Sequence, residues 1–233
     1  MLKDKLHTIV LCLRSGGDFN HRDVEVLSRN IWKHWQGANL RIICLNDQIS
    51  QPFLLNNYML YPTPQKQWEG WWTKMNLFSP EMEQFRPFLY IDLDTAIVND
   101  VSIMFPTEEN ENKFIALGNF KIDKLTTELQ SGLMWIPAKS ITVTKIWDAW
   151  NSDSTRHQRV YKRGGDQLFL KNTIKAPEAY WQNSTNAITS FKINGSGGWL
   201  KEIPNHISIV CFHGFPRIWE ASASIQWLKN YIK

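Results

Sequence analysis

The sequence predicts an α/β fold with a mostly parallel central sheet flanked by helices. Apolar runs at 7–13 (HTIVLCL) and 40–47 (LRIICLND) are typical of buried strands, and a Gly-rich turn follows the first run. Between them, residues 22–35 carry apolar side chains three or four positions apart, which favours an amphipathic helix. Strand, helix and strand form a βαβ unit, whose parallel strands place ligand sites at their carboxyl ends.

The apolar stripe of the first helix consists of Val24, Leu27, Ile31 and Trp35. The predicted elements that follow, in chain order, are a strand near 57–62 (NYMLYP), a helix at 72–82 (WTKMNLFSPEM), a strand at 88–91 (FLYI), strands at 112–120 and 131–137, a helix at 141–151, a helix at 164–174 that opens on a glycine pair, and a last strand at 206–215. The basic run 156–163 (RHQRVYKR) is interpreted as a solvated loop, with an acidic acceptor as the functional alternative.

Length and composition indicate one domain spanning 1–233, with a modest positive charge. A net charge of +4 and a pI near 8.9 suit anionic ligands such as phosphates but fall short of a nucleic-acid binder, so no nucleic acid is expected. Cys12, Cys44 and Cys211 lie in apolar runs without paired spacing and are interpreted as buried thiols. No segment reads as a transmembrane helix or a signal peptide, so we expect a cytoplasmic protein.

Twelve tryptophans are an unusual number for this length, and three of them cluster in QWEGWW at 67–72. Indoles fill protein cores, but they also present flat apolar faces with one polar edge, on which sugar rings can stack. The composition therefore raises the possibility of a carbohydrate site.

Two aspartates, Asp92 and Asp94, follow directly after the predicted strand 88–91 and are separated by Leu93. At a strand end, alternation places both carboxylates on one side and Leu93 on the other. Two hard oxygen donors this close suit Mg²⁺ or Mn²⁺, which bridge carboxylates and a diphosphate. Short aspartate pairs also cap turns. The buried strand before the pair favours a ligand site.

A third candidate metal ligand, His213, also follows an apolar strand run. Its imidazole suits Mn²⁺, whereas the alternative is a histidine with a structural role. Gly214 permits a close backbone approach, and Arg217 supplies a planar fork of N–H donors that suits phosphate oxygens. His213, Gly214 and Arg217 together favour a metal and diphosphate site more strongly than any one of them does alone.

These motifs together resemble glycosyltransferases of the GT-A fold, especially the glycogenin and bacterial galactosyltransferase-like enzymes of family 8 and their small bacterial and viral relatives. The resemblance covers most of the chain, and the motifs occur in the family's order. They are LCLRSGGDF at 11–19, CLND at 44–47, WWTKMNLFSP at 71–80, YIDLDT at 90–95, SGLMWI at 131–136, GGDQLFL at 164–170 and CFHGFPRIW at 211–219.

The resemblance implies a Rossmann-like, mostly parallel sheet with a smaller antiparallel portion on the acceptor side. Residues 1–100 would form the nucleotide-binding half and 101–233 the acceptor-binding half. It further implies an enzyme that uses Mn²⁺ (or Mg²⁺) to move a hexose from a nucleotide sugar, with UDP-sugars favoured, to an acceptor hydroxyl with retention of configuration. The acceptor could be a saccharide, a lipid-linked saccharide, a protein or a modified base.

The resemblance also assigns roles to single residues. Asp92, Asp94 and His213 would hold the metal, with Leu93 between the aspartates, and Gly214 and Arg217 would face the diphosphate. Better-known relatives space this last motif as His-x-x-Gly-x-x-Lys-Pro-Trp, whereas here the residues from His213 to Trp219 follow a shorter spacing with Arg in place of Lys. An Arg–Lys exchange changes a point charge into a fork, so the phosphate contact of Arg217 needs a structural test.

On the nucleotide side, the resemblance places Arg14, Ser15 and Gly16 in the loop around the base and ribose. Asp47 would accept the base's ring N–H, unless it caps a turn. Lys74 would touch the sugar nucleotide, with surface solvation as its alternative.

On the sugar side, Asp166 would contact donor hydroxyls or assist at the reaction centre, with Gln167 close by. The structural alternative makes Asp166 the N-cap of its helix. Ser131 and Gly132 would line the same pocket. Trp71 and Trp72 would wall the acceptor site, with core packing as the alternative.

Three other functions fit parts of the pattern. Haloacid-dehalogenase-like phosphatases also pair two aspartates at a strand end, but in their first strand and with Thr or Val where this chain has Ala96. A non-catalytic nucleotide-sugar or carbohydrate binding module would share the fold and lack turnover. A nucleic-acid binder would rest on the basic run alone and would bind with a steep salt dependence.

Overall fold

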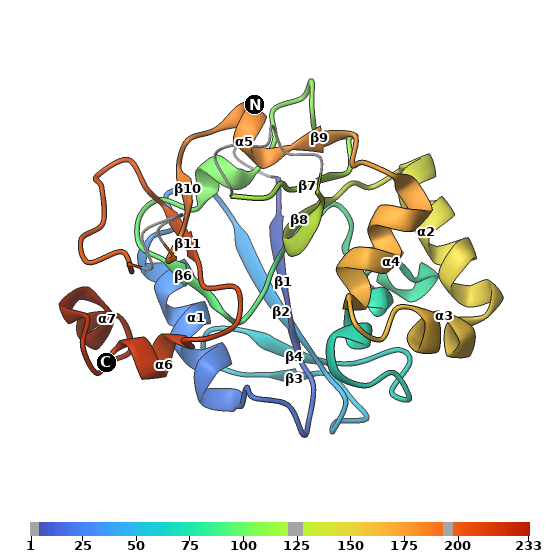
Figure 1. Ribbon diagram of the computed structural model, residues 1–233, viewed down its shortest axis with the longest axis horizontal. Coiled ribbons are helices and arrows are strands. Elements are labelled where there is room, and N and C mark those ends of the chain that lie inside the picture. The colour runs from blue at the N-terminus through green and yellow to red at the C-terminus, as the bar shows by residue number, and fades with distance from the viewer. Residues whose placement is uncertain (1–4, 121–127, 193–197) are drawn as a thin grey trace.

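A computed structural model describes residues 5–120, 128–192 and 198–233. Within these residues an eight-stranded sheet runs through the centre of the molecule in the order β3-β4-β2-β1-β5-β8-β7-β9 (Figure 1). Its strands are β1 (His7–Leu13), β2 (Leu40–Asn46), β3 (Phe53–Leu54), β4 (Met59–Pro62), β5 (Phe88–Ile91), β7 (Ile115–Leu117), β8 (Gln130–Ile136) and β9 (Ala179–Tyr180). The predicted α/β class with a central sheet is confirmed.

Four neighbouring strands of the sheet, β4, β2, β1 and β5, run parallel, as the βαβ pattern predicts, while β3 pairs antiparallel with β4. β1 pairs in parallel with β2 and β5, and β2 pairs in parallel with β4. The helix between β1 and β2 is α1 (His21–Lys33), which begins at a capping box formed by Asn20 and Asp23. The carboxyl ends of β1, β2 and β5 therefore meet at one edge of the sheet.

The rest of the sheet is mixed, and a second, small sheet stands beside it. β8 pairs antiparallel with both β5 and β7. The small sheet has the order β10-β11-β6, with β10 (Ile188–Ser190), β11 (Ile209–Cys211) and β6 (Thr95–Ile97). Its β11–β6 pair is antiparallel and matches Cys211 with Thr95, so the residues after β11 run back past the turn that precedes β6.

The helix predicted at 72–82 is instead a pair of short 3-10 helices, η1 (Gly70–Phe78) and η2 (Pro80–Phe85). Ser79 between them has an extended backbone, with ψ of 154°. The residue before a proline is disfavoured in the helical region, and Pro80 has no backbone N–H to continue the ladder. Proline therefore divides the predicted helix.

Several shorter helices complete the structure. The predicted helices at 141–151 and 164–174 are confirmed as α2 and α4. The helices are α2 (Ile141–Ser152), α3 (Ser154–Val160), α4 (Gly165–Ile174), α5 (Trp181–Ser184), α6 (Ile218–Ala221), α7 (Gln226–Tyr231) and the 3-10 turn η3 (Ser102–Met104).

The prediction of a loop at 156–163 is wrong for its first part, because residues 156–160 belong to the helix α3. Asp153 caps this helix by accepting a hydrogen bond from the backbone N–H of Arg156 at 2.9 Å. No residue of α3 is buried, so the run lacks the apolar stripe by which a helix is recognised in sequence. The expected solvation of the charges is confirmed.

The last predicted strand, 206–215, is longer than the strand in the structure, since β11 covers only three residues. β6 and β10 are equally short, and the sequence pattern indicated neither. The C-terminal segment packs on the domain: Leu228 and Tyr231 of α7 are buried, and the backbone N–H of Ile97 donates to the Tyr231 hydroxyl at 3.3 Å. In the part of the chain that the structure describes, no helix is long and apolar enough to cross a membrane.

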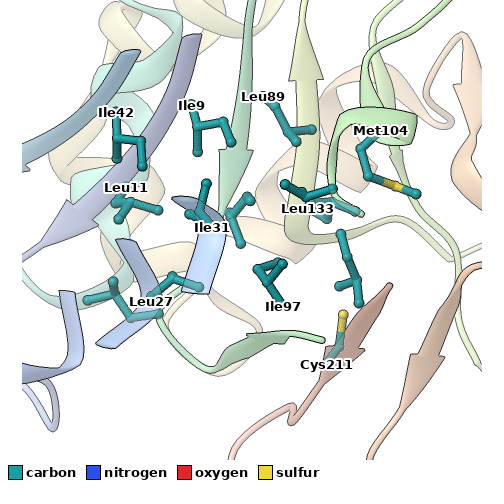
Figure 2. Packing of buried hydrophobic residues seen from close by; sticks show 14 of the residues in the cluster. Ile9, Leu11, Leu27, Ile31, Ile42, Leu89, Ile97, Met104, Leu133 and Cys211 are labelled. Carbon is teal, nitrogen blue, oxygen red and sulfur yellow. The ribbon is translucent and has the colours of Figure 1, made fainter. Parts of the chain in front are cut away.

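The hydrophobic core has a layer on each face of the sheet. One layer joins α1, the small sheet and the central strands, and Figure 2 shows Leu27 and Ile31 of α1 close to Ile9 and Leu11 of β1. The other layer packs η1, α2 and α4 against the opposite face and contains Trp72 and Trp150. Both layers support the sheet edge where β1 and β5 end.

Ile31→Ala is expected to lower the free energy of unfolding by about 3 kcal/mol, because it removes buried methyl groups and leaves a cavity. Ile31 is fully buried between α1 and the sheet. Urea denaturation followed by circular dichroism measures the change. Val160→Ala, at a 61% exposed position on α3, is the control and should shift the free energy by less than about 0.5 kcal/mol. Equal effects at the two positions would contradict the assigned core.

Candidate active site

The two aspartates lie in the turn that links β5 to β6. The backbone N–H of Asp92 donates to the carbonyl of Gly132 on β8 at 2.9 Å, and the backbone N–H of Phe212 donates to the carbonyl of Asp94 at 3.0 Å. The turn is therefore fixed between β8 on one side and the chain leaving β11 on the other. Leu93 is buried, as alternation predicts, while both carboxylates reach cavities.

A buried lysine joins the first aspartate to the start of α4. Lys74 Nζ lies 2.8 Å from Asp92 Oδ2, 3.5 Å from Asp166 Oδ2 and 3.3 Å from the Ser131 hydroxyl. Surface solvation is thus ruled out for Lys74. Burial lowers the pKa of Lys74, but attraction by Asp166 and Asp92 outweighs it and raises the pKa above its usual value. The ammonium is therefore charged at neutral pH.

Asp166 is a buried member of the site and does not cap its helix. The N-cap of α4 is Gly164, without a side-chain cap, and Asp166 follows in the first turn. Burial raises the pKa of Asp166, and the neighbouring Lys74 opposes that rise. Gln167, next along the helix, is exposed and lines the same two cavities as Asp92 and Asp94.

The second aspartate is paired with an arginine from the far end of the chain. Arg217 Nη1 lies 3.1 Å from Asp94 Oδ2, and Arg217 Nη2 lies 2.7 Å from Asp18 Oδ2. The guanidinium also stands 4.8 Å from the centre of the Phe19 ring, a cation–π distance. The shortened His213–Trp219 motif therefore does bring Arg217 to the aspartates.

His213 presents a buried ring nitrogen without a hydrogen-bond partner. Its backbone has φ of 52°, and its carbonyl accepts from Lys192 Nζ at 2.7 Å. The Nε2 atom is buried and bonds to no other group of the described residues. Burial, reinforced by the charge of Lys192, lowers the pKa of His213 to about 4. The imidazole is therefore neutral at physiological pH and keeps a lone pair for a ligand.

Asp92, Asp94 and His213 line one cavity of about 290 Å³, together with Gly132 and Gly214. Within the described ranges, no three His, Cys, Asp or Glu side chains lie close enough together to form a complete metal site. The three side chains therefore share a cavity, with Lys74 and Arg217 paired to the carboxylates, and their role as metal ligands stays a prediction. Two carboxylates and a neutral imidazole with an unpaired nitrogen are a donor set that fits Mn²⁺ or Mg²⁺.

A larger cavity of about 410 Å³ opens beside the first and shares its aspartates. It is lined by residues from both halves of the chain, and these include eight of the predicted site residues: Arg14, Lys74, Asp92, Leu93, Asp94, Asp166, Gln167 and Arg217. Four carboxylates and three cations line it, with Asp18 as the fourth carboxylate. These eight residues therefore gather around one cavity at the edge of the sheet where β1 and β5 end.

Three predicted residues of the nucleotide loop, Ser15, Gly16 and Asp47, lie outside the linings of both cavities. Asp47 accepts hydrogen bonds from the backbone N–H of Ser15 at 2.8 Å, from the Ser15 hydroxyl and from Arg14. Partial burial raises the pKa of Asp47, but the bonds from Ser15 outweigh this and lower it. Asp47 thus anchors the loop after β1, where Gly16 adopts φ of 76°.

The two predicted wall tryptophans have different surroundings. Trp72 is buried in the core and stacks on Trp150, with ring centres 5.1 Å apart, so its alternative role in packing is confirmed. Trp71 is 50% exposed and lines the larger cavity.

Sequence reasoning missed Tyr90, Asp18 and Phe19. The Tyr90 hydroxyl donates a hydrogen bond to Asp92 Oδ1. The signal was available, because Tyr90 stands two residues before Asp92 and alternation brings both to one side of the strand. Asp18 and Phe19 contact Arg217 from the loop after β1, and nothing in the local sequence links positions about 200 apart.

No protein-family model and no curated protein sequence matches the chain. Solved glycosyltransferases have a similar fold. GlyE of Streptococcus pneumoniae TIGR4 is 14% identical with a TM-score of 0.63, over 98% of this chain and 60% of GlyE. The galactosyltransferase LgtC, solved with donor and acceptor sugar analogues, is 12% identical with a TM-score of 0.61, over 96% and 93% of the chains. Mouse xyloside xylosyltransferase 1 is 10% identical with a TM-score of 0.53, over 90% and 98%.

These likenesses confirm the GT-A fold predicted from the sequence motifs, with the mostly parallel sheet and the smaller second sheet. This chain spans about 60% of the length of GlyE. Assignment to family 8 stays a prediction.

Asp47→Asn is expected to lower the free energy of unfolding by about 2 kcal/mol at pH 7, because Arg14 and Ser15 lose a charged, largely buried partner. The lowered pKa of Asp47 stabilises the fold above the unfolded pKa near 3.9, and this contribution disappears as the pH falls through the folded pKa. Chemical denaturation at pH 7 and near pH 3.5 tests this. The gap between variant and wild type should narrow at the lower pH, while exposed Asp148→Asn, the control, should match wild type at both.

Proposed function

We propose that the protein is a metal-dependent glycosyltransferase that moves a hexose from a nucleotide sugar, a UDP-sugar by preference, to an acceptor hydroxyl. The observation that carries this proposal is the shared cavity of Asp92, Asp94 and His213 at the carboxyl end of β5. The fold likeness to glycosyltransferases supports it, and one of these was solved with donor and acceptor sugar analogues. We keep the cytoplasmic location predicted from the sequence as part of the proposal.

The charge balance of the site supports the need for a metal. Four carboxylates against three cations line the larger cavity, so on its own it repels the diphosphate of a nucleotide sugar. Asp92, Asp94 and His213 would hold Mn²⁺ or Mg²⁺. A divalent cation bound there supplies Lewis-acid stabilisation of the negative charge on a departing diphosphate. Residues 1–100 provide the aspartates for this, in keeping with the proposed nucleotide-binding half.

The cationic side chains of the site have distinct tasks. Arg217 carries a planar fork beside Asp94, a position from which it can donate to phosphate oxygens. Lys74 lies deeper and is shared by Asp92 and Asp166, so it holds these carboxylates in place rather than facing solvent. Arg14 at the mouth of the nucleotide loop is held by Asp47.

Asp166 and Gln167 are the candidates for the sugar side. Breaking the anomeric bond leaves positive charge on the sugar ring, which a nearby carboxylate or amide oxygen stabilises electrostatically. Gln167 lines both cavities, and Asp166, the residue before it in the first turn of α4, lines the larger one. From the family resemblance we further propose retention of configuration, with the acceptor-binding half in 101–233.

A non-catalytic binding module of the same fold is the second candidate. The network around Asp166 argues against it, because burying two carboxylates on one lysine costs stability and a simple binding site does not require it. Turnover distinguishes the two.

The wild-type protein is expected to release free nucleotide slowly from one UDP-sugar in the presence of Mn²⁺. Asp94→Asn should reduce this hydrolysis about 100-fold, since it weakens the stabilisation of the leaving group. A panel of nucleotide sugars assayed for nucleotide release by chromatography makes the measurement. Asp148→Asn is the matched control, because it makes the same chemical change at an exposed position on α2. Equal rates in Asp94→Asn and wild type would remove the metal assignment.

UDP together with Mn²⁺ is expected to raise the melting temperature by about 5 to 10 °C at 100 times the dissociation constant, because both bind only the folded protein. UDP alone should give little stabilisation, since the carboxylates repel it. Differential scanning fluorimetry with UDP, Mn²⁺ and both together measures the shifts. Stabilisation by UDP alone that equals the shift with Mn²⁺ would show that the cavity binds diphosphate without a metal.

A further inference from the structure

Four cationic side chains on α3 and in the turn after it have no acidic partner. Arg156, Arg159, Lys162 and Arg163 are all exposed, and they take part in no ion pair with any residue for which the structure gives a position. Two carboxylates flank these cations in sequence: Asp153 accepts the backbone N–H of Arg156 and caps the start of α3, and Asp166 pairs with Lys74. The positive charge of this surface is therefore available to a ligand.

A tight turn fixes the last two of these cations beside the candidate active site. The backbone N–H groups of Gly164 and Gly165 both donate to the carbonyl of Tyr161, at 3.0 and 2.8 Å. This turn connects α3 directly to α4, as Figure 1 shows. Arg163 precedes Asp166 by three residues, so their Cα atoms lie at most about 11 Å apart.

A half-exposed indole, Trp71, lines the larger cavity and contacts the turn that carries the cations. Gly165 has φ of 60°, and a Cβ atom there would lie 2.9 Å from Trp71 Nε1. The indole of Trp71 thus packs directly on the backbone at the start of α4, a contact that only glycine permits. Half of Trp71 remains exposed, and the residue also lines the larger cavity with Asp166 and Gln167.

We propose that Trp71, Lys162 and Arg163 form an acceptor subsite for an anionic saccharide. The proposal rests on the proposed glycosyltransferase function and names its acceptor class. The exposed indole face offers a stacking surface for a sugar ring beside the reaction centre. Lys162 and Arg163 stand three and two residues before Gly165, on which Trp71 packs. They would bind a phosphate or carboxylate carried by the same saccharide.

The local arrangement favours a saccharide over a nucleic acid. Single-stranded nucleic acids bind along a groove in which several aromatic side chains stack successive bases, whereas this surface has one exposed indole beside the cations. The net charge of +4 is also small for a nucleic-acid binder. A short charged sugar matches one stacking surface and two neighbouring cations.

The test compares three trisaccharide probes on the protein saturated with UDP and Mn²⁺. Maltotriose is neutral, trigalacturonic acid carries carboxylates, and maltotriose 6-phosphate carries a phosphate. Titration calorimetry at low ionic strength is expected to give about tenfold tighter binding for at least one charged probe than for maltotriose. The comparison of the two charged probes distinguishes a carboxylate acceptor from a phosphate acceptor.

The double variant Lys162→Gln with Arg163→Gln should abolish this preference and leave nucleotide release from the UDP-sugar unchanged. The matched control, Lys229→Gln with Lys233→Gln, removes the same charge at exposed positions in and after α7, on the opposite side of the molecule in Figure 1, and should keep the preference. Trp71→Ala should weaken all three probes, and Trp71→Phe should restore most of their binding.

Equal binding of charged and neutral probes, or a preference that survives the loss of both cations, would overturn the proposal. Tight binding of duplex or single-stranded DNA with a steep salt dependence, in place of the probes, would reassign the surface to nucleic acid. Nucleotide release is assayed without any acceptor. A failure of the subsite is therefore distinguishable from a failure of the proposed function, which would abolish release itself.

Discussion

The site depends on one buried ammonium group, Lys74 Nζ, which is shared by Asp92 and Asp166. The three residues come from η1, from the turn after β5 and from the first turn of α4, which lie far apart in the sequence. Without the lysine, two carboxylates would be buried close together, and both would tend to take up protons. The lysine opposes this uptake of protons and fixes α4 against the sheet edge. The electrostatics of the candidate site and the packing of α4 therefore depend on the same interaction.

A second pairing performs the same task from the other side of the turn. Arg217 bonds Asp94 and Asp18, and so joins the loop after β1 to the segment after β11. Phe19 contributes an aromatic face to the guanidinium, and Trp219 packs edge-on to Phe19 with ring centres 5.7 Å apart. The loop that follows the first strand is thus anchored twice, by Asp47 at its start and by Arg217 at its end. Both anchors leave the cavity between them open.

The sequence predicted the features that depend on local pattern. The β1-α1-β2 unit follows from periodicity, and the Asp92–Asp94 pair follows from a buried run that ends in carboxylates. The sequence could not predict features that distant contacts set, such as the Asp18–Arg217 pair, which has no local signal. It also did not indicate α3, because none of the residues of this helix is buried and an apolar stripe is therefore missing. The break between η1 and η2 was readable at Pro80 and was missed, because the apolar spacing on both sides continues through it. Strands of three residues, such as β6 and β10, are too short to show alternation.

Backbone register, rather than the local sequence, sets where the residue after Phe212 lies. The β11–β6 pairing and the hydrogen bond from Phe212 N–H to the Asp94 carbonyl place position 213 beside the aspartates, whichever residue occupies it. The histidine at this position has a buried Nε2 without a hydrogen-bond partner, and burial lowers its pKa. The position of the arginine after residue 213 is less tightly fixed by the sheet, because its long flexible side chain can reach the Asp94 carboxylate from more than one place along the chain. In the segment His213–Trp219, sheet pairing therefore places the histidine, whereas Arg217 reaches Asp94 through its long side chain.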